Sequence, residues 1–491
     1  MEANIRNLIY QKLISKSNPA SHPLPYKKVI PGGEIKPSVL KELAKIVGPA
    51  NFLTSPEELA VYSYDATGRE SLPWAVARPV KSTEVSRILS LANRERFPIV
   101  PRGAGTGMSG GSVPSQGGVV LSFERMNKII EINEKDFLAI VEPGVVTGEL
   151  QRAVEARGLF YPPDPASNQF CTIGGNVAEC AGGLRAVKYG VTKDYVLGLE
   201  VVLPTGEIIN TGARTVKSVA GYDLTKLIVG SEGTLGVVTK IIVRLLPLPE
   251  SVSTLAAFFN SVDAAVCAAS RILANRIVPR ALELVDQAAL RAVEAYLKED
   301  LSKGAEAMVL VEVDGAAEST ERESGRVADI LTQSGALRVI PAESPAEREH
   351  LWKARRSISP ALYAIKPKKL NEDIVVPRSR IAEILREIGK IAKLHDLLIV
   401  NFGHAGDGNI HTNIMVEEAD LPRAEAAVRE IFDATLRLGG SISGEHGIGI
   451  TKAAYLPLEA DPGALAAMQR IKQALDPNNI LNPGKIFLEP R

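Results

Sequence analysis

The loop Pro101-Arg102-Gly103-Ala104-Gly105-Thr106-Gly107-Met108-Ser109-Gly110-Gly111 follows an apolar run at 98–100 and precedes a β-type run at 119–123. Successive glycines let main-chain N–H groups converge on an anion without Cβ clashes, and a nucleotide diphosphate is the natural occupant. The loop lacks the Gly-Lys-Ser/Thr of a P-loop. A strand pattern, not a helix, follows it, which argues against a Rossmann fingerprint. Taken alone, the loop is equally consistent with a structural turn.

Three more glycine-rich segments favour a ligand-binding role for this loop over a purely structural turn. They lie at 172–183, which is preceded by the proline-rich run 162–167, at 189–190, and at 230–238. Together with the first loop they predict a long ligand that is covered by backbone along its length.

Two histidine-containing segments, Gly403-His404-Ala405-Gly406-Asp407-Gly408-Asn409-Ile410-His411 and Gly444-Glu445-His446-Gly447-Ile448-Gly449, hold three of the six histidines of the chain. Apolar runs at 397–402 and 410–415 flank a tight turn, which predicts a β-hairpin with His404 and His411 at its ends. Two imidazoles and a carboxylate leave one position open in a catalytic zinc-type site. Any one of these histidines alone is more often a packing or capping residue.

Composition narrows the classes of function. The 57 basic and 57 acidic residues give a net charge of zero, which argues against a broad grip on nucleic acid or on an anionic membrane. The three cysteines form no Cys-x-x-Cys pair, so we expect no iron–sulfur cluster and a reducing compartment. No secretory signal and no apolar run of membrane-spanning length is found, and we expect a cytoplasmic protein without a membrane span.

The chain divides into four parts by pattern. Residues 1–35 form an N-terminal extension, 36–249 an α+β domain, 250–437 a domain of strands separated by long helices, and 438–491 a C-terminal segment. Strands are predicted at 75–80, 98–102, 119–123, 138–141 and 199–203 in the first domain, and at 255–259, 281–285, 308–313, 374–376, 397–402 and 410–415 in the second.

In combination, Pro-Arg-Gly-x-Gly-Thr, Ile-Gly-Gly-Asn, Gly-Ser-Glu-Gly-Thr-Leu-Gly and the two histidine segments resemble the FAD-linked oxidases of vanillyl-alcohol-oxidase-type fold. Within them, the chain is similar to the D-2-hydroxyacid dehydrogenase branch, which includes D-lactate dehydrogenases and the D subunit of glycolate oxidase. The resemblance covers residues 50–487. It implies a two-subdomain FAD-binding domain of PCMH type, a cap domain of antiparallel sheet covered by helices, and a C-terminal tail that returns to the FAD domain.

The resemblance also implies which residues bind FAD. The set is Arg102, Gly103, Ala104, Gly105, Thr106, Gly107 and Ser109 at the diphosphate, Pro163, Ser167, Gly174, Gly175, Asn176, Gly182, Gly183, Tyr189 and Gly190 along the flavin, Glu232, Gly233, Gly236 and Val238 near the nucleotide part, and Asn482 over the ring. No histidine lies between Gly103 and Gly111, so we expect non-covalent FAD.

The family carries a divalent metal, usually zinc and sometimes manganese, cobalt or iron, on positions that match His404, His411 and Glu445. His446 matches its proton acceptor, and an unperturbed imidazole pKa of about 6.5 suits that task. Arg355 of Trp-x-x-Arg matches its carboxylate clamp, since a guanidinium can bind both oxygens. The predicted substrate contacts also include Ser359, Lys369 and Asn413; for Lys369 a surface position is the more common alternative.

These features predict metal-assisted oxidation of a small D-2-hydroxy acid, D-lactate or glycolate, with hydride transfer to flavin N5. Electrons would pass to an iron–sulfur subunit, an electron-transferring flavoprotein or a quinone. Four alternatives remain open: a D-2-hydroxyglutarate dehydrogenase, a metal-dependent hydrolase, a non-catalytic flavin subunit of an electron-transfer complex, and an ether-lipid synthase of the same fold.

Overall fold

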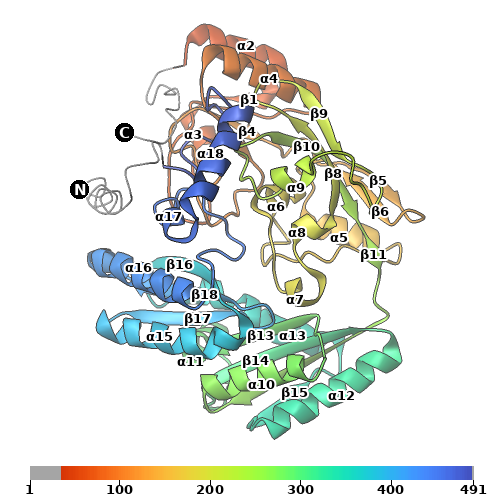
Figure 1. Cartoon of the computed structure of the whole chain (residues 1–491), viewed down its shortest axis with the longest axis vertical. Helices are drawn as coiled ribbons and strands as arrows, with labels where there is room; N and C mark the ends of the chain where they lie inside the picture. Colours follow the sequence, from red (N-terminus) through yellow and green to blue (C-terminus); the bar gives the residue numbers. More distant parts are fainter. Residues whose placement is uncertain (1–34, 489–491) are drawn as a thin grey trace.

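A computed structural model describes residues 35–488. The predicted extension 1–35 lies almost wholly outside the described residues. The chain before residue 250 forms the upper part of Figure 1, and the green-to-blue segment that follows forms the lower part. The C-terminal helix α18 (Pro462–Leu475) returns to the upper part, beside the glycine-rich half of the chain.

The upper part contains two sheets. The first has the order β1-β2-β4-β3, with β2, β4 and β3 parallel, and the second has the order β5-β6-β10-β8-β9 and is antiparallel. The strands are β1 (Phe52–Leu53), β2 (Ala75–Ala77), β3 (Ile99–Arg102), β4 (Val119–Ser122), β5 (Ile129–Asn133), β6 (Leu138–Val141), β8 (Val196–Val202), β9 (Ile208–Gly212) and β10 (Val237–Arg244); β7 (Leu159–Phe160) pairs with β11 (Leu246–Pro247).

Helices cover these sheets and connect their strands. They are α2 (Pro37–Val47), α3 (Pro56–Ala60), α4 (Ser82–Glu95), α5 (Thr147–Glu155), α6 (Ile173–Glu179), α7 (Ala186–Tyr189), α8 (Thr192–Tyr195), α9 (Leu224–Ile228), α17 (Leu456–Glu459) and α18, with the 3₁₀ turn η1 (Pro49–Asn51). The C-terminal tail joins the first sheet, because the amide of Ile99 donates to the carbonyl of Ile480 and that of Asn482 to the carbonyl of Ile99.

The lower part is one seven-stranded antiparallel sheet with the order β15-β12-β14-β13-β17-β18-β16. Its strands are β12 (Ser251–Phe259), β13 (Ala281–Asp286), β14 (Ala307–Gly315), β15 (Arg338–Pro341), β16 (Lys368–Val375), β17 (Leu398–His404) and β18 (Asn409–Val416). Its helices are α10 (Val262–Ala274), α11 (Gln287–Leu297), α12 (Ala317–Gln333), α13 (Pro345–Arg356), α14 (Ile358–Leu362), α15 (Ile381–Leu394) and α16 (Leu421–Arg437), with the 3₁₀ turns η2 (Arg378–Arg380) and η3 (Glu418–Asp420).

Side chains of this sheet alternate between two helix layers, as the period of two in a strand requires. On β12, Leu255 and Phe259 pack with α10, α12, α15 and α16, whereas Ala256 and Phe258 pack with α11, α13 and α14. The predicted antiparallel sheet covered by helices is confirmed. We call the side toward α11, α13 and α14 the site face, because it carries the polar residues described below.

Every strand run predicted from the sequence is present, but β5, β9, β10, β15 and the two-residue strands β1, β7 and β11 were not predicted. β5 and β15 lie at sheet edges and contain no buried residue, so their sequences lack a strong apolar pattern. β16 begins at Lys368, whereas its start was predicted at residue 374, because five of its first six residues are polar. Among residues 35–488, no helix is long and apolar enough to cross a membrane.

Candidate functional site

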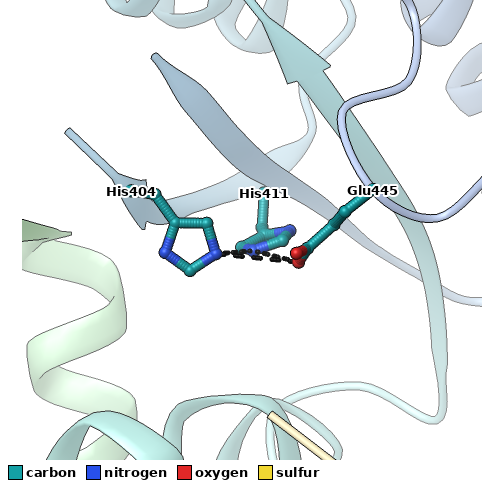
Figure 2. A group of neighbouring side chains, drawn as sticks. All are labelled: His404, His411 and Glu445. Carbon is teal, nitrogen blue, oxygen red and sulfur yellow. Dashed lines mark hydrogen bonds and ion pairs between the residues drawn. The ribbon is translucent and has the colours of Figure 1, made fainter. Parts of the chain in front are cut away.

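Three side chains from two distant segments converge above the site face (Figure 2). The Nε2 atoms of His404 and His411 lie 3.3 Å apart, and they lie 3.6 and 3.5 Å from Oε1 of Glu445. Zn–N distances of about 2.0–2.1 Å place the ligand atoms of a tetrahedral site about 3.3 Å apart. The spacing and the N/N/O donor set therefore fit one zinc-type cation with a fourth position for a small ligand.

The two histidine side chains point toward the same place because they lie on the same face of two paired strands. The hairpin β17–β18 pairs His404 with Asn409, and its four-residue turn 405–408 is tight enough to require φ +94° at Gly408. His404 follows Val400 and Phe402 on the site face, and His411 precedes Met415 there. The predicted hairpin is confirmed; His404 is the last residue of β17, whereas His411 is the third residue of β18.

The protonation of His411 and Glu445 suits metal binding. Burial alone would lower the pKa of His404, but the charges and hydrogen bonds of Glu283 and Glu445 raise it well above its usual value, so a cation has to displace a proton from this imidazole. Burial lowers the pKa of His411 well below its usual value, so this imidazole is neutral. Burial alone would raise the pKa of Glu445, but the hydrogen bond and charge of His404 and the other imidazoles lower it to about 2. The site thus offers a carboxylate and a neutral imidazole, which are the ligating forms.

Glu283, which the sequence analysis missed, orients His404. Its Oε1 lies 2.6 Å from Nδ1 of His404, and its Oε2 accepts from Nε of Arg355 at 2.9 Å. A carboxylate on Nδ1 fixes the imidazole so that Nε2 presents its lone pair to a metal. A glutamate inside the apolar run 281–285 was a sequence signal for such a role, because a fully buried carboxylate requires partners.

Asp373, at the C-terminal end of β16, holds the segment that carries Glu445 and His446. Its Oδ2 accepts the main-chain N–H groups of Gly444, Glu445 and His446 at 2.9, 2.7 and 2.9 Å. Its Oδ1 receives Nζ of Lys452 and lies 3.5 Å from Nδ1 of His446. Asp373 was not predicted, because the strand was expected to begin one residue later, at 374.

The predicted substrate contacts lie on the same side of the sheet. The guanidinium of Arg355 stacks over the Phe402 ring at 4.7 Å, and its Nε and Nη2 atoms bind the carboxylate of Glu283. Nη1 and the second hydrogen of Nη2 are the donors that are left for a substrate. Nζ of Lys369 donates to Oγ of Ser359 at 2.7 Å, and burial lowers the pKa of this lysine to about 8. The side chain of Lys369 is therefore partly buried on the site face.

Asn413 completes this row of polar groups. It is fully buried, accepts from Nδ2 of Asn371 at 2.6 Å and donates to main-chain carbonyls. Asn371 was not predicted, and its own Oδ1 is buried without a hydrogen-bond partner. The pair extends the polar surface along β16 and β18 from the His411 side toward Lys369.

A cavity in the upper part reaches the metal-type site, and Glu445 and His446 line its end. Sixteen of the predicted FAD-binding residues line it: Arg102, Gly103, Ala104, Gly105, Thr106, Gly107, Ser167, Gly174, Gly175, Asn176, Gly182, Glu232, Gly233, Gly236, Val238 and Asn482. Five predicted residues do not line it: Ser109, Pro163, Gly183, Tyr189 and Gly190. Tyr189 instead donates its hydroxyl to Asp314 at 2.8 Å.

The cavity wall fits a long polar cofactor. A Cβ at Gly103 would lie 2.3 Å from Oγ1 of Thr172, and Gly105 has φ +70°, so the loop backbone itself forms the wall. Asn482 donates to the carbonyls of Gly111 and Glu232 at 2.8 and 2.7 Å, while its Oδ1 is buried without a partner. Close backbone approach and an unused acceptor are what a bound dinucleotide requires.

Comparisons with known proteins agree with this architecture. Residues 73–212 match the FAD binding domain and residues 248–486 the C-terminal domain of FAD linked oxidases. The chain is 48% identical over 457 residues to the glycolate oxidase subunit GlcD of Bacillus subtilis (strain 168), covering 92% of this chain and 97% of that protein. It is 34% identical over 466 residues to a D-lactate dehydrogenase of Anaerostipes hadrus, covering 92% and 98%.

Among solved structures, p-cresol methylhydroxylase with substrate bound superposes with a TM-score of 0.78 at 19% identity, covering 94% of this chain and 99% of that chain. At this identity the likeness concerns the fold alone. Fold, cavity and sequence relatives together define a flavoprotein oxidoreductase. The chain belongs to the FAD-linked oxidase family, as the sequence motifs predicted, and FAD is its cofactor.

Asp373 and its neighbour Glu372 provide a matched pair for a stability test. Both are buried and face Lys452, but Oε2 of Glu372 has no hydrogen-bond partner, and burial raises the pKa of Glu372 to about 7. We expect Asp373→Asn to lower the free energy of unfolding by about 3 kcal/mol, because charged acceptors of several N–H groups are lost. Glu372→Gln should cost less than about 1 kcal/mol. Denaturant unfolding of both variants measures this, and equal losses would contradict the anchoring role of Asp373.

Proposed function

We propose that the protein oxidises a small D-2-hydroxy acid, D-lactate or glycolate, to the 2-oxo acid and that it uses FAD and a divalent cation. The observation that carries the proposal is that Glu445, a candidate metal ligand, and the adjacent His446 both line the end of the cofactor cavity. Relatives named glycolate oxidase subunit and D-lactate dehydrogenase span nearly the whole chain and support the substrate class.

His446 is the proposed proton acceptor. Its Nδ1 faces Oδ1 of Asp373 at 3.5 Å, and its ring stacks on that of His411 at a centroid distance of 5.4 Å. Nε2 is then the atom that takes the hydroxyl proton of the substrate, and the Asp373 carboxylate stabilises the imidazolium that forms. FAD, when bound, supplies the acceptor for the hydride of the α-carbon.

His404, His411 and Glu445 would hold the cation, and zinc is favoured over iron or manganese because of the tetrahedral spacing and the N/N/O donors. A divalent cation, when bound, supplies a Lewis acid that lowers the pKa of a ligated hydroxyl. Glu283 keeps His404 oriented for that ion.

Arg355, Ser359, Lys369 and Asn413 are the proposed substrate contacts. Arg355 and Lys369 supply positive charge on the site face, which suits a substrate carboxylate. Ser359 and Asn413 supply hydroxyl and amide groups beside them. Because the site face carries two cations, Arg355 and Lys369, a dicarboxylate such as D-2-hydroxyglutarate is also a candidate substrate. It belongs among the acids to be tested.

FAD is proposed to be non-covalent. Cys171 lines the cavity, but burial raises the pKa of its thiol, and Sγ is hydrogen-bonded to Thr147 at 3.3 Å. A protonated thiol is a poor nucleophile toward the flavin ring. A protein acceptor, an iron–sulfur subunit or an electron-transferring flavoprotein, is the proposed electron outlet; relatives are named as a subunit of glycolate oxidase.

The direct test is anaerobic bleaching of the FAD holoprotein by a panel of D- and L-2-hydroxy acids. We expect D-lactate or glycolate to bleach the flavin fastest, L-lactate to bleach it poorly, and a chelator to abolish bleaching until Zn²⁺ is restored. If the chelator leaves the rate of flavin bleaching unchanged, the reaction does not need the cation, and this part of the proposal is wrong. Turnover of an ester or amide without flavin reduction would favour a hydrolase.

Glu283→Gln tests the orientation of His404. The neutral amide has one acceptor oxygen in place of two and accepts the Nδ1–H hydrogen bond more weakly than a carboxylate does, so we expect zinc affinity to fall about 10–100-fold. Competition with a coloured chelator measures it. Asp286→Asn on the same strand is the control, because Asp286 caps α11 and lies outside the ligand set. Equal affinity of Glu283→Gln and the wild type would exclude this role.

His446→Ala tests the base. We expect the rate of flavin reduction by substrate to fall about 10²–10⁴-fold, because proton transfer to a positioned base is lost. FAD content and zinc content should stay at wild-type levels, since His446 is not among the ligands. Stopped-flow absorbance measures the rate, and an unchanged rate would assign the proton to another group.

A further inference from the structure

One half-buried carboxyl group in the cofactor cavity has no part in the proposed reaction. Glu179, the last residue of α6, lines the cavity together with His446 and Glu232. Its Oε2 is buried and has no hydrogen-bond partner within the described chain. A Cβ at Gly447 would lie 2.5 Å from this atom, and one at Gly111 would lie 2.7 Å from Oε1, so glycines on both sides make room for the group.

The carboxyl group of Glu232 lies close to that of Glu179, and both of its oxygens accept hydrogen bonds. A Cβ at Gly447 would lie 2.9 Å from Oε1 of Glu232, which places both carboxyl groups against the same glycine. Main-chain N–H groups of Ile448 and Gly449 donate to Oε1 and Oε2 of Glu232 at 2.8 and 2.7 Å. Since two carboxylates that lie side by side in a poorly solvated cavity repel each other, Glu232 is the member of the pair that can carry the charge.

The nearest cation does not neutralise Glu179. Nζ of Lys485 donates to the carbonyls of Gly110 and Val113 and to Oγ of Ser115 at 2.8, 2.5 and 3.4 Å, which uses its three donors. Burial and the charge of Glu232 raise the pKa of Glu179 well above its usual value. Glu179 is therefore the protonated member, and its O–H is a donor that needs an acceptor.

We propose that Glu179 is a neutral carboxylic acid that donates a hydrogen bond from Oε2 to the ring system of bound FAD and so stabilises the electron-rich reduced ring. Its place supports this: the group lines the same cavity as His446 and lies against Gly447, the residue that follows this proposed base. A fixed donor in a site shielded from water acts strongly on the charge of the reduced ring. The proposal rests on FAD in this cavity and not on which acid is the substrate.

The test compares Glu179→Ala and Glu179→Gln holoprotein with the wild type in a dithionite titration against a reference dye. Loss of the donor should lower the reduced-to-oxidised ratio at a fixed potential at least tenfold in Glu179→Ala, or about 30 mV for a two-electron couple. Glu179→Gln should stay within about threefold of the wild type, because its amide N–H₂ still donates. Asp286→Asn, a carboxyl change outside the cavity, should leave the ratio unaltered.

A wild-type ratio in Glu179→Ala would overturn the proposal, and so would an equal shift in both Glu179 variants. If Glu179→Ala fails to retain FAD, infrared difference spectra of the oxidised and reduced wild type decide the question. The protonated carboxyl C=O band should shift on reduction and be missing in Glu179→Gln; its absence from the wild type would also overturn the proposal. Because dithionite reduces the flavin, failure of every hydroxy acid to bleach it leaves this test intact.

Discussion

The carboxylate of Asp373 joins the two halves of the site. Main-chain N–H groups of Gly444, Glu445 and His446 all point at its Oδ2, and Lys452 binds its Oδ1. Without this anchor Glu445 and His446 would belong to a glycine-rich segment that is free to adopt other paths. Glu445, which completes the metal-type triad, and His446, the proposed base, take their positions from this one buried, multiply bonded charge.

A second constraint is the alternation of side chains along the strands. Glu283, His404, His411, Asn413 and Asp373 occupy site-face positions of four adjacent strands of the antiparallel sheet. A shift of one residue in any strand would turn its polar group into the apolar layer formed with α10, α12, α15 and α16. The apolar packing of the opposite face thus fixes the register on which the polar site depends.

Much of the fold and of the candidate site could be predicted from the sequence. The glycine-rich loop 101–111, the hairpin that carries His404 and His411, and the family motifs predicted the cofactor cavity and the three candidate ligands. Glu283, Asn371 and Asp373 were missed because their neighbours in space are far away in the chain: the Glu283–His404 contact spans 121 residues and the Asp373–Glu445 contact spans 72. Glu179 was hidden inside a segment that was interpreted for its glycines alone.

The sequence by itself determined the local shapes and the chemistry of the ligands. Glycine spacing, strand periodicity and tight turns act over a few residues, so they can be recognised without a fold. Only the tertiary structure decided which charges compensate each other. Arg355 pairs with Glu283, Lys485 donates its hydrogen bonds to main-chain carbonyls, and Glu179 lies beside Glu232. Burial and pairing set the state of an ionisable group, and both are properties of the assembled chain.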